Sequence, residues 1–520
     1  MAHNFICNKD TAIADTKQGK IRGYFYDDIF IFKGIPYARA ARFCPPRPVE
    51  PWDGILETTS YGYVCPLLEM PKPNGELAVP HRYWVMDEDC QNLNVWTPAC
   101  DGEKRPVLVW LHGGGYESGS AIEHLAYEGE NMCRIGQVVV VSINHRLNIL
   151  GYFDLSAYGQ AYENSGNAGT EDIIAALRWV KDNIANFGGD PDNVTVFGQS
   201  GGGDKVTTLL QTPAADGLYA KGVNMSGVLG PRLSCGEGDG EELAIALMAE
   251  LGIDNEIREL ETVPYAAMAQ AYNRIRPEFA QAGKYIGCAP FPNAFYKGSP
   301  EKAGFRSETA HVPLLVGTVY GEFQAFMPCV QQAGGLSDEE GERLVRQIAG
   351  DAAAGELLPL YRAAYPKRNP AGLLTLDFFF RLPAQQFIRL RSALNDCTYS
   401  YLFNQDLPLN GGNTPWHCAD IPYVFHNTEL VPVTQQGGVT EKLETQIFCS
   451  LIAFAKTGDP NNIALPHWPA SKPGQEQTMI FCEDTNVRCN HDAKLVPLAE
   501  KHLGPVFEKM MEENRERVQH

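Results

Sequence analysis

The chain has 520 residues, of which 44% are hydrophobic and 20% charged, a globular composition that excludes a disordered or fibrous protein. Its 43 lysines and arginines against 63 aspartates and glutamates give a formal net charge of -20. This summed negative field repels nucleic-acid phosphates and anionic lipid surfaces, so we expect neither nucleic acid nor a membrane as a partner.

Targeting signals are not evident in the sequence. No apolar run approaches the roughly 20 residues that cross a bilayer, and Met1–Lys9 lacks the basic start and apolar stretch of a secretory signal. We therefore expect a cytoplasmic protein. Its 14 cysteines are scattered without the tight paired spacing of a disulfide scaffold, which predicts mostly reduced packing thiols.

Short β-branched runs recur along the chain and predict a mostly parallel sheet, because each run is apolar throughout, as in strands covered on both faces. These runs are Val107–Leu111, Val138–Ile143, Val194–Phe197 and Val312–Val316. Before the third run, an apolar stripe at helical spacing predicts a helix that ends ahead of Gly188. The alternation of strands and helices favours an α/β fold.

The rest of the chain is predicted to be mainly helical. Residues 236–310 and 336–394, with approximate bounds, are richer in charge and helix formers, and we interpret them as helical insertions that cap a site. A further helix is predicted to end at Gly458, and Leu498–Val518 has the pattern of a charged amphipathic helix. No repeat or linker separates independent halves, so we expect one domain over residues 1–520.

The strongest local motif is G-x-S-x-G at residues 198–202, directly after a predicted strand. In a nucleophile elbow the turn is so sharp that side chains at the flanking glycines would collide with neighbouring elements. The serine hydroxyl is then exposed at a helix N-terminus. The motif predicts Ser200 as a nucleophile; the alternative is a glycine-rich turn without chemistry.

A second motif, H-G-G-G at residues 112–115, also follows an apolar strand. Consecutive glycines allow backbone N–H groups to converge on a developing oxyanion, because no side chain intervenes. The alternative is a flexible loop.

The two motifs together resemble the type-B carboxylesterases, the carboxylesterase/cholinesterase family with the α/β-hydrolase fold. The resemblance extends to residues 19–23, 32–38, 88–96 and 187–191, and so runs nearly end to end. It implies an α/β-hydrolase with a central mostly parallel sheet flanked by helices. It also implies hydrolysis of a small-molecule ester, with no metal or organic cofactor, by a catalytic set in the order serine, acid, histidine.

On the family pattern the acid is Glu322, just beyond a predicted strand, and the histidine is His417, after the predicted strand Tyr399–Phe403. The resemblance implies that Glu322 orients the imidazole and that His417 takes the proton of Ser200 as general base. We expect Ser200 and His417 to be accessible to solvent. The resemblance further implies an oxyanion hole made by the N–H groups of Gly114, Gly115 and Gly201.

Four residues depart from the family pattern or lack an assigned role. Gln199 replaces the acidic residue common before the serine, and Cys418, beside the histidine, replaces a small residue and is interpreted as a packing thiol. Asp204 is expected to be a hydrogen-bonded structural carboxylate, with a substrate role as the alternative. Arg232 is expected on the solvated surface, with contact to an anionic acyl group as the alternative.

The remaining alternatives concern thiols and function. Cys65 and Cys90 fall where the family places its first disulfide, and we expect them reduced; Cys482 and Cys489 have irregular spacing for a metal site. We expect a monomeric serine carboxylic-ester hydrolase that cleaves small, mostly uncharged esters through an acyl-enzyme. The same set could serve thioesters, lactones or carbamates. A catalytically inactive cholinesterase-like adhesion or scaffold protein is the rival from another class.

Overall fold

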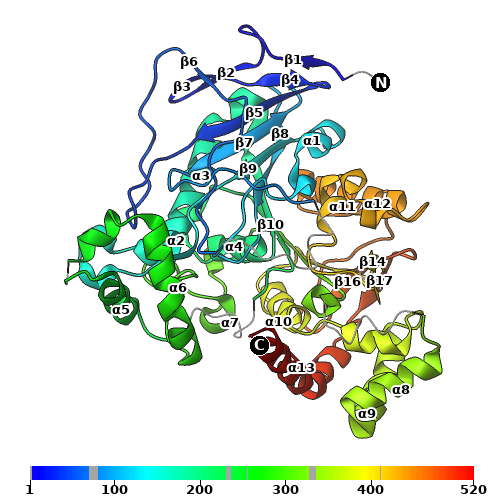
Figure 1. Ribbon diagram of the computed structural model, residues 1–520. Coiled ribbons are helices and arrows are strands. Elements are labelled where there is room, and N and C mark those ends of the chain that lie inside the picture. The colour runs from blue at the N-terminus through cyan, green and yellow to red at the C-terminus, as the bar shows by residue number, and fades with distance from the viewer. Residues whose placement is uncertain are drawn as a thin grey trace.

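A sheet of 12 strands runs through the centre of the computed structural model, which describes residues 3–69, 80–229, 236–254, 256–326, 335–409 and 412–519 (Figure 1). Every pairing from β9 across to β16 is parallel, and antiparallel strands flank this part on both sides. The strands in spatial order are β1 (Phe5–Ile6), β4 (Tyr24–Tyr26), β5 (Ile29–Pro36), β7 (Asn92–Thr97), β9 (Val139–Ile143), β8 (Arg105–Leu111), β10 (Gly189–Gln199), β11 (Lys221–Met225), β12 (Leu314–Val319), β13 (Thr398–Phe403), β16 (Gln477–Phe481) and β17 (Asn486–Cys489).

Helices cover both faces of this sheet, with α3 on one side and α11 and α12 on the other (Figure 1). Two small sheets lie apart from it: β2 (Ile13–Thr16) with β3 (Gly19–Arg22) and β6 (Ile55–Glu57), and β14 (Pro408–Leu409) with β15 (Gly412–Asn413). The α-helices are α1 (Glu130–Gly136), α2 (Asn148–Tyr152), α3 (Ala168–Asn183), α4 (Gly201–Leu210), α5 (Glu241–Leu251), α6 (Tyr265–Gln281), α7 (Pro300–Ala303), α8 (Asp338–Ala349), α9 (Asp351–Ala364), α10 (Arg381–Ser392), α11 (Ile421–Phe425), α12 (Thr440–Thr457) and α13 (Leu495–Gln519).

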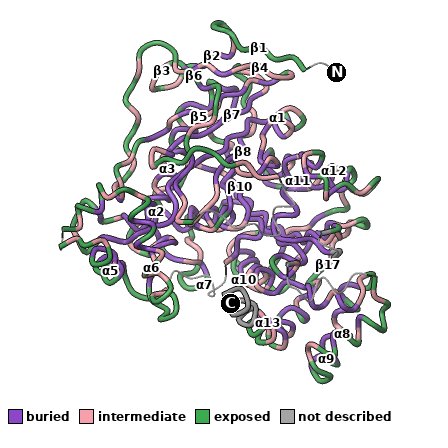
Figure 2. Tube along the Cα trace, viewed as in Figure 1, coloured by how far each residue is buried: buried purple, intermediate pink, exposed green. Residues whose placement is uncertain are grey.

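Strand β8 shows how the apolar runs form the core. Val107, Val109 and Leu111 contact the apolar cluster that includes α3, whereas Leu108 and Trp110 contact the cluster that includes α11 and α12. Successive side chains of a strand point to opposite faces, so a continuous apolar run supplies both layers at once. The predicted mostly parallel sheet is therefore confirmed, and Figure 2 shows its strands buried along most of their length.

The predicted helix before Gly188 is confirmed as α3, which continues as a 3₁₀ turn, η6 (Ile184–Phe187). The strand that follows, β10, begins earlier than predicted, at Gly189 instead of Val194. Gly189 pairs with Arg105 of β8, and the pairing shifts register between Gly189 and Val194. Such an irregularity accommodates the polar residues that the apolar pattern excluded from the strand.

The antiparallel strands at the N-terminal side of the sheet were not predicted. Strand β7 is buried throughout although it carries polar residues. Asn94 is satisfied there by tertiary partners: it accepts from the Gly34 N–H at 3.0 Å and donates to Ser142 Oγ at 3.0 Å. Polar side chains interrupt the apolar signal of a strand, while such hydrogen bonds make their burial acceptable.

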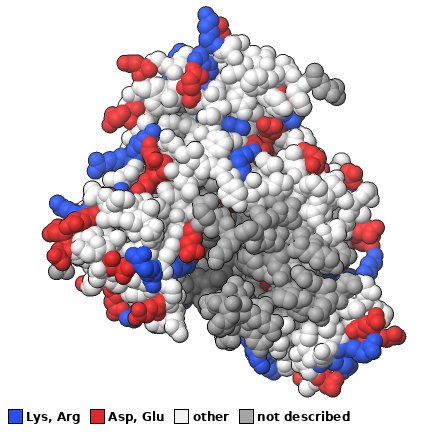
Figure 3. All heavy atoms as spheres, in the orientation of Figure 1, with Lys and Arg blue, Asp and Glu red and all other residues white. Residues whose placement is uncertain are grey.

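The two intervals interpreted as helical insertions hold α5 to α7 and α8 to α10. In Figure 1, α5 and α6 lie at one lower corner of the molecule, and α8 and α9 lie at the other. Figure 3 shows acidic and basic side chains side by side over these helices on the visible face. None of the helices within the described ranges is long and apolar enough to cross a bilayer.

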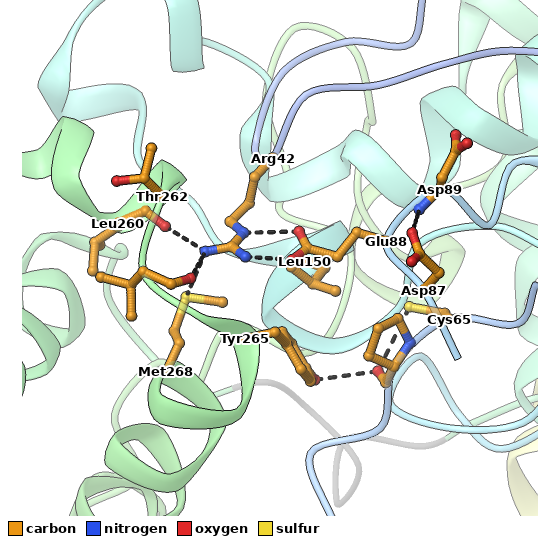
Figure 4. Close-up of polar contacts among 12 residues, drawn as sticks. Arg42, Cys65, Asp87, Glu88, Asp89, Leu150, Leu260, Thr262, Tyr265 and Met268 are labelled. Carbon is orange, nitrogen blue, oxygen red and sulfur yellow. Dashed lines mark hydrogen bonds and ion pairs between the residues drawn. The ribbon is translucent and has the colours of Figure 1, made fainter. Parts of the chain in front are cut away.

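Arg42 ties the N-terminal segment to the first of these helical regions (Figure 4). Its guanidinium pairs with Glu88 and donates to the carbonyl oxygens of Leu260 at 2.6 Å and Val263 at 2.7 Å. The Arg42 side chain is only 7% exposed. Since Leu260 and Val263 lie in the segment between α5 and α6, the arginine holds that segment against the body of the protein.

Candidate active site

Ser200 stands in a sharp turn between β10 and α4. Its backbone has φ 58° and ψ −128°, strained values for a residue other than glycine, and its N–H donates to the Met225 carbonyl at 2.8 Å. A Cβ atom on Gly198 would lie 2.4 Å from the Gly202 carbonyl carbon, and one on Gly202 would lie 1.9 Å from the Leu111 carbonyl oxygen. The turn therefore requires glycine at both positions, and it leaves Ser200 partly exposed.

The glycine loop after β8 packs directly on this turn. Gly114 and Gly115 have φ values of 83° and 63°, which favour glycine. A Cβ atom on Gly201 would lie 2.2 Å from the Gly115 carbonyl oxygen, so loop and helix backbones touch. Over the described ranges of the chain, the N–H groups of Gly114, Gly115 and Gly201 donate to no protein acceptor. Three unpaired donors next to a serine suit the binding of an anionic oxygen.

His417 and Glu322 are joined by a hydrogen bond of 2.5 Å between Nδ1 and Oε2. The other carboxylate oxygen of Glu322 accepts from the Ser226 hydroxyl at 2.6 Å and from the Val319 N–H at 2.7 Å. Because the carboxylate can only accept, it places the proton of a neutral imidazole on Nδ1 and leaves Nε2 as the basic atom. Sequence reasoning did not identify Ser226; its signal was a Ser-Gly pair at the end of a core strand.

The His417 ring is packed against two aromatic rings from other segments of the chain. Phe323 lies 4.3 Å and Phe380 5.0 Å from it, measured between ring centroids. His417 is 2% exposed, so the expectation that it is accessible to solvent was wrong. The two phenylalanines come from distant segments that only the fold brings together.

Four of the twelve non-glycine residues with positive φ in the described ranges lie at this site. Ser200, Ser226, Glu322 and Cys418 have φ values of 58°, 47°, 41° and 76°, although none of them is glycine. Each such residue costs of order 1–3 kcal/mol and persists only where the surroundings determine it. Their clustering marks these segments as held in place for a purpose other than stability.

Ser200 and His417 come from segments that meet through Gln199. The Gln199 amide nitrogen lies 3.2 Å from Nε2 and 3.5 Å from Nδ1 of His417. Among the described residues, no hydrogen bond joins Ser200 Oγ to the His417 ring. The structure thus pairs the predicted base with the predicted acid and places the predicted nucleophile next to the residue that touches the base.

Two further carboxylates lie buried near Glu322. Asp420 accepts from the Tyr401 hydroxyl at 2.7 Å, and burial, opposed by this bond, raises the pKa of Asp420 to about 6. Asp377 accepts from three backbone N–H groups that open α10, and burial together with the charge of Glu322 raises its pKa to about 8. Burial and the neighbouring charge of Glu322 thus favour the protonated, neutral forms of both carboxyls.

Asp204 is hydrogen-bonded, as expected. Its Oδ2 accepts from the Tyr116 hydroxyl at 2.6 Å, and burial raises the pKa of Asp204 to about 7. Tyr116 also contacts the Thr208 hydroxyl at 2.9 Å, which joins the glycine loop to α4. Arg232 lies outside the described residues. Cys65 and Cys90 are free, buried thiols.

Sequence reasoning missed Lys205, which follows Ser200 by little more than one helical turn. Its side chain is 1% exposed, and Nζ donates to the His112 carbonyl at 3.0 Å. Burial lowers the pKa of Lys205 to about 7. A buried lysine is costly unless it is paired, so its position here indicates that it holds the first carbonyl of the glycine loop. Its signal in the sequence was a lysine inside the helical segment that directly follows the serine.

We predict that Lys205→Met lowers kcat/KM for a chromogenic ester by roughly 10–100-fold, because the loss of about 1.5–3 kcal/mol of binding to His112 loosens the glycine loop. Lys221→Met is the matched control. Lys221 is also buried, but it is the first residue of β11 and so lies at the amino end of that strand, opposite to the site. Both variants should lose stability in urea titrations, and only Lys205→Met should lose activity. Equal activity in the two variants would contradict this role.

Comparisons with known proteins give one family. The sequence model of the carboxylesterase family matches residues 10–496. Para-nitrobenzyl esterase from Bacillus subtilis is 31% identical over 490 residues, which cover 92% of this chain and 96% of that protein. Phenmedipham hydrolase from Pseudarthrobacter oxydans is 29% identical over 491 residues, which cover 91% and 95% respectively.

Solved structures agree with the sequence comparisons. An esterase from the anaerobe Clostridium hathewayi, described as able to hydrolyse aliphatic aromatic polyesters, has a TM-score of 0.93 and 50% identity, with 96% of this chain and 100% of that chain covered. A thermophilic para-nitrobenzyl esterase has a TM-score of 0.75 and 29% identity, with 94% and 99% covered. The shared fold thus includes the strands and turns that carry the site.

Proposed function

Because the chain belongs to the carboxylesterase family and is a carboxylic ester hydrolase, we propose that Ser200 is its nucleophile, His417 its general base and Glu322 the acid that orients the base. One observation carries the proposal. At the carboxyl ends of neighbouring strands, an elbow serine stands beside three unpaired N–H donors, and Gln199, the residue before it, touches a histidine bonded to a buried carboxylate.

In the proposed cycle, His417 Nε2 accepts the hydroxyl proton of Ser200 as Oγ attacks the ester carbonyl. The N–H groups of Gly114, Gly115 and Gly201 bind the oxyanion, each typically worth about 3 kcal/mol in the transition state. The imidazolium then protonates the leaving alcohol, and a water molecule repeats the attack on the acyl-enzyme. A catalytic hydrogen bond that is long in the unliganded protein commonly tightens in the substrate complex.

The proposed substrates are small, mostly uncharged esters. Supporting this, the residues that flank the base are the aromatic rings of Phe323 and Phe380, and Phe323 is 48% exposed next to it. A second candidate is a segment of an aliphatic aromatic polyester, because the relative described with that activity is 50% identical over nearly the whole chain. Hydrolysis rates over esters of graded acyl and alcohol size, including a soluble aromatic diester, distinguish the two.

Thioesters, lactones and carbamates remain alternatives for the same machinery. One relative, from Anas platyrhynchos, is named a fatty acyl-CoA hydrolase precursor and is 30% identical over 498 residues. A medium-chain thioester therefore belongs in the substrate panel. The comparisons do not favour the inactive adhesion or scaffold protein, since the relatives are named as esterases and hydrolases.

We predict that an organophosphonate labels the protein once, on Ser200, and abolishes ester hydrolysis in proportion to labelling. Peptide mapping by mass spectrometry locates the adduct, and Ser226, which also lies at the site, serves as the internal comparison. An adduct on Ser226, or a folded sample that hydrolyses esters without being labelled, would refute the assignment of Ser200. A folded sample that neither reacts nor hydrolyses esters would support the inactive rival.

A further inference from the structure

Two residues that depart from the family pattern are in direct contact with each other and with the base. The Cys418 thiol donates to the Gln199 carbonyl oxygen at 3.2 Å, and the amide nitrogen of Gln199 faces the His417 ring. Gln199 is 1% and Cys418 7% exposed. The two residues are 219 positions apart in the chain.

The direction of the Gln199 amide follows from its neighbours. Glu322 accepts the proton on Nδ1 of His417, so the ring of the neutral base has no second N–H to offer to Gln199. The thiol of Cys418 is a donor, which matches the carbonyl oxygen of the amide. The amino group of Gln199 therefore faces the imidazole, with its partial positive charge directed at the ring.

The two distances locate this amino group relative to the ring. It lies 3.2 Å from Nε2 and 3.5 Å from Nδ1 of His417. A donor on the axis of the Nε2 lone pair would lie outside the ring edge. Its distance to Nδ1 would then be much longer than the observed 3.5 Å. The amino group of Gln199 is therefore close to both ring nitrogens. It does not lie on the Nε2 lone-pair axis, along which the Ser200 hydroxyl is expected to donate.

We propose that Gln199 is a positioning residue that keeps His417 uncharged, and that the thiol of Cys418 fixes the direction of the Gln199 amide. The partial positive charge of the amino group disfavours a second proton on the ring. The base consequently remains deprotonated, and the enzyme active, at more acidic pH than it would with an acidic residue at position 199.

The carboxylate of Glu322 acts on His417 in the opposite sense. Glu322 contacts the ring from the turn after β12, and Asp420 interacts with it electrostatically from the start of α11. Asp377, before α10, faces Glu322, and Tyr401 of β13 donates to Asp420. The negative charge of Glu322 stabilises the imidazolium, whereas burial and the charge of Glu322 favour the protonated, neutral forms of Asp377 and Asp420. The amino group of Gln199 offsets part of the effect of Glu322 on the ring.

The test is the acid limb of the pH profile of kcat/KM, measured on a neutral chromogenic ester with three variants. Gln199→Glu should raise the apparent pKa of this limb by at least about one unit, because a carboxylate replaces a donor beside the ring. Gln199→Met, which keeps the length of the side chain, and Cys418→Gly should each raise it by about half a unit. Glycine suits the φ of 76° at position 418, so Cys418→Gly should fold.

Two comparisons separate this role from general structural damage. Cys418→Ser keeps a hydrogen-bond donor and should raise the apparent pKa of the acid limb less than Cys418→Gly does. Gln211→Glu places a carboxylate at another buried glutamine, at the far end of α4, and should leave the limb in place. An unchanged limb in both Gln199 variants would overturn the proposal, as would an equal shift in Gln211→Glu.

The inference rests on the proposed function, and the two fail differently. If His417 is not the base, the organophosphonate still labels Ser200. The apparent pKa of the acid limb then does not change in Gln199→Glu, and the role proposed for Gln199 is wrong as well. If the wild type neither labels nor hydrolyses esters, the proposed function itself fails before any variant is compared.

Discussion

Ser200→Ala is expected to lower kcat/KM for a chromogenic ester by about 10⁴-fold or more, because no acyl-enzyme can form without the hydroxyl. The residual rate would come from the oxyanion donors and substrate binding alone. The measurement is steady-state hydrolysis after removal of traces of contaminating esterase, with a parallel organophosphonate titration that should show no adduct.

The same substitution is expected to leave stability almost unchanged. Ser200 is partly exposed, and the contacts that hold its turn are made by its backbone, through Met225 and Asp204. The thermal unfolding midpoint should therefore move by no more than about 2 °C. Ser156→Ala, at an exposed serine in a surface turn, is the matched control for both measurements. Activity above about one hundredth of the parent value would mean that another residue is the nucleophile.

His417→Ala is expected to cause a loss of similar size, about 10⁴-fold in kcat/KM, because the proposed general base for Ser200 is removed. Unlike Ser200→Ala, this variant should also lose about 2–3 kcal/mol of unfolding free energy. It leaves the buried carboxylate of Glu322 without its ring partner and opens a space between Phe323 and Phe380.

A second variant keeps the test of the base independent of folding. His417→Gln retains an amide donor for Glu322 and most of the side-chain volume, so it should be more stable than His417→Ala while being as inactive. Urea titration and ester hydrolysis on the same preparations check both expectations. Retention of activity within tenfold of the parent in His417→Gln would show that the wrong base has been chosen.

Local sequence determined more of the site than might be expected for a chain of this length. The glycines around Ser200 and those after β8 are needed because a Cβ atom would collide with backbone at those turns, and such a requirement is visible in a few consecutive residues. The apolar runs of β8, β9 and β12 were visible for a similar reason, since a strand buried on both faces shows no alternation.

The partners of the catalytic side chains were not visible in this way. Glu322 and His417 were placed by resemblance to a family, and their pairing depends on β12 and β13 lying side by side in the sheet. Lys205 and Ser226 act on the site through a carbonyl oxygen and a carboxylate that belong to other segments. No pattern within their own segments specifies those partners.

Sequence alone thus determined the α/β architecture, the elbow and the glycine loop, because steric limits and apolar periodicity act between near neighbours in the chain. Only the tertiary structure decided that His417 is buried, that polar β7 is a core strand, and that Gln199 and Cys418 meet at the base. These outcomes depend on which distant segments the sheet order brings together, and burial and hydrogen bonding are properties of that arrangement.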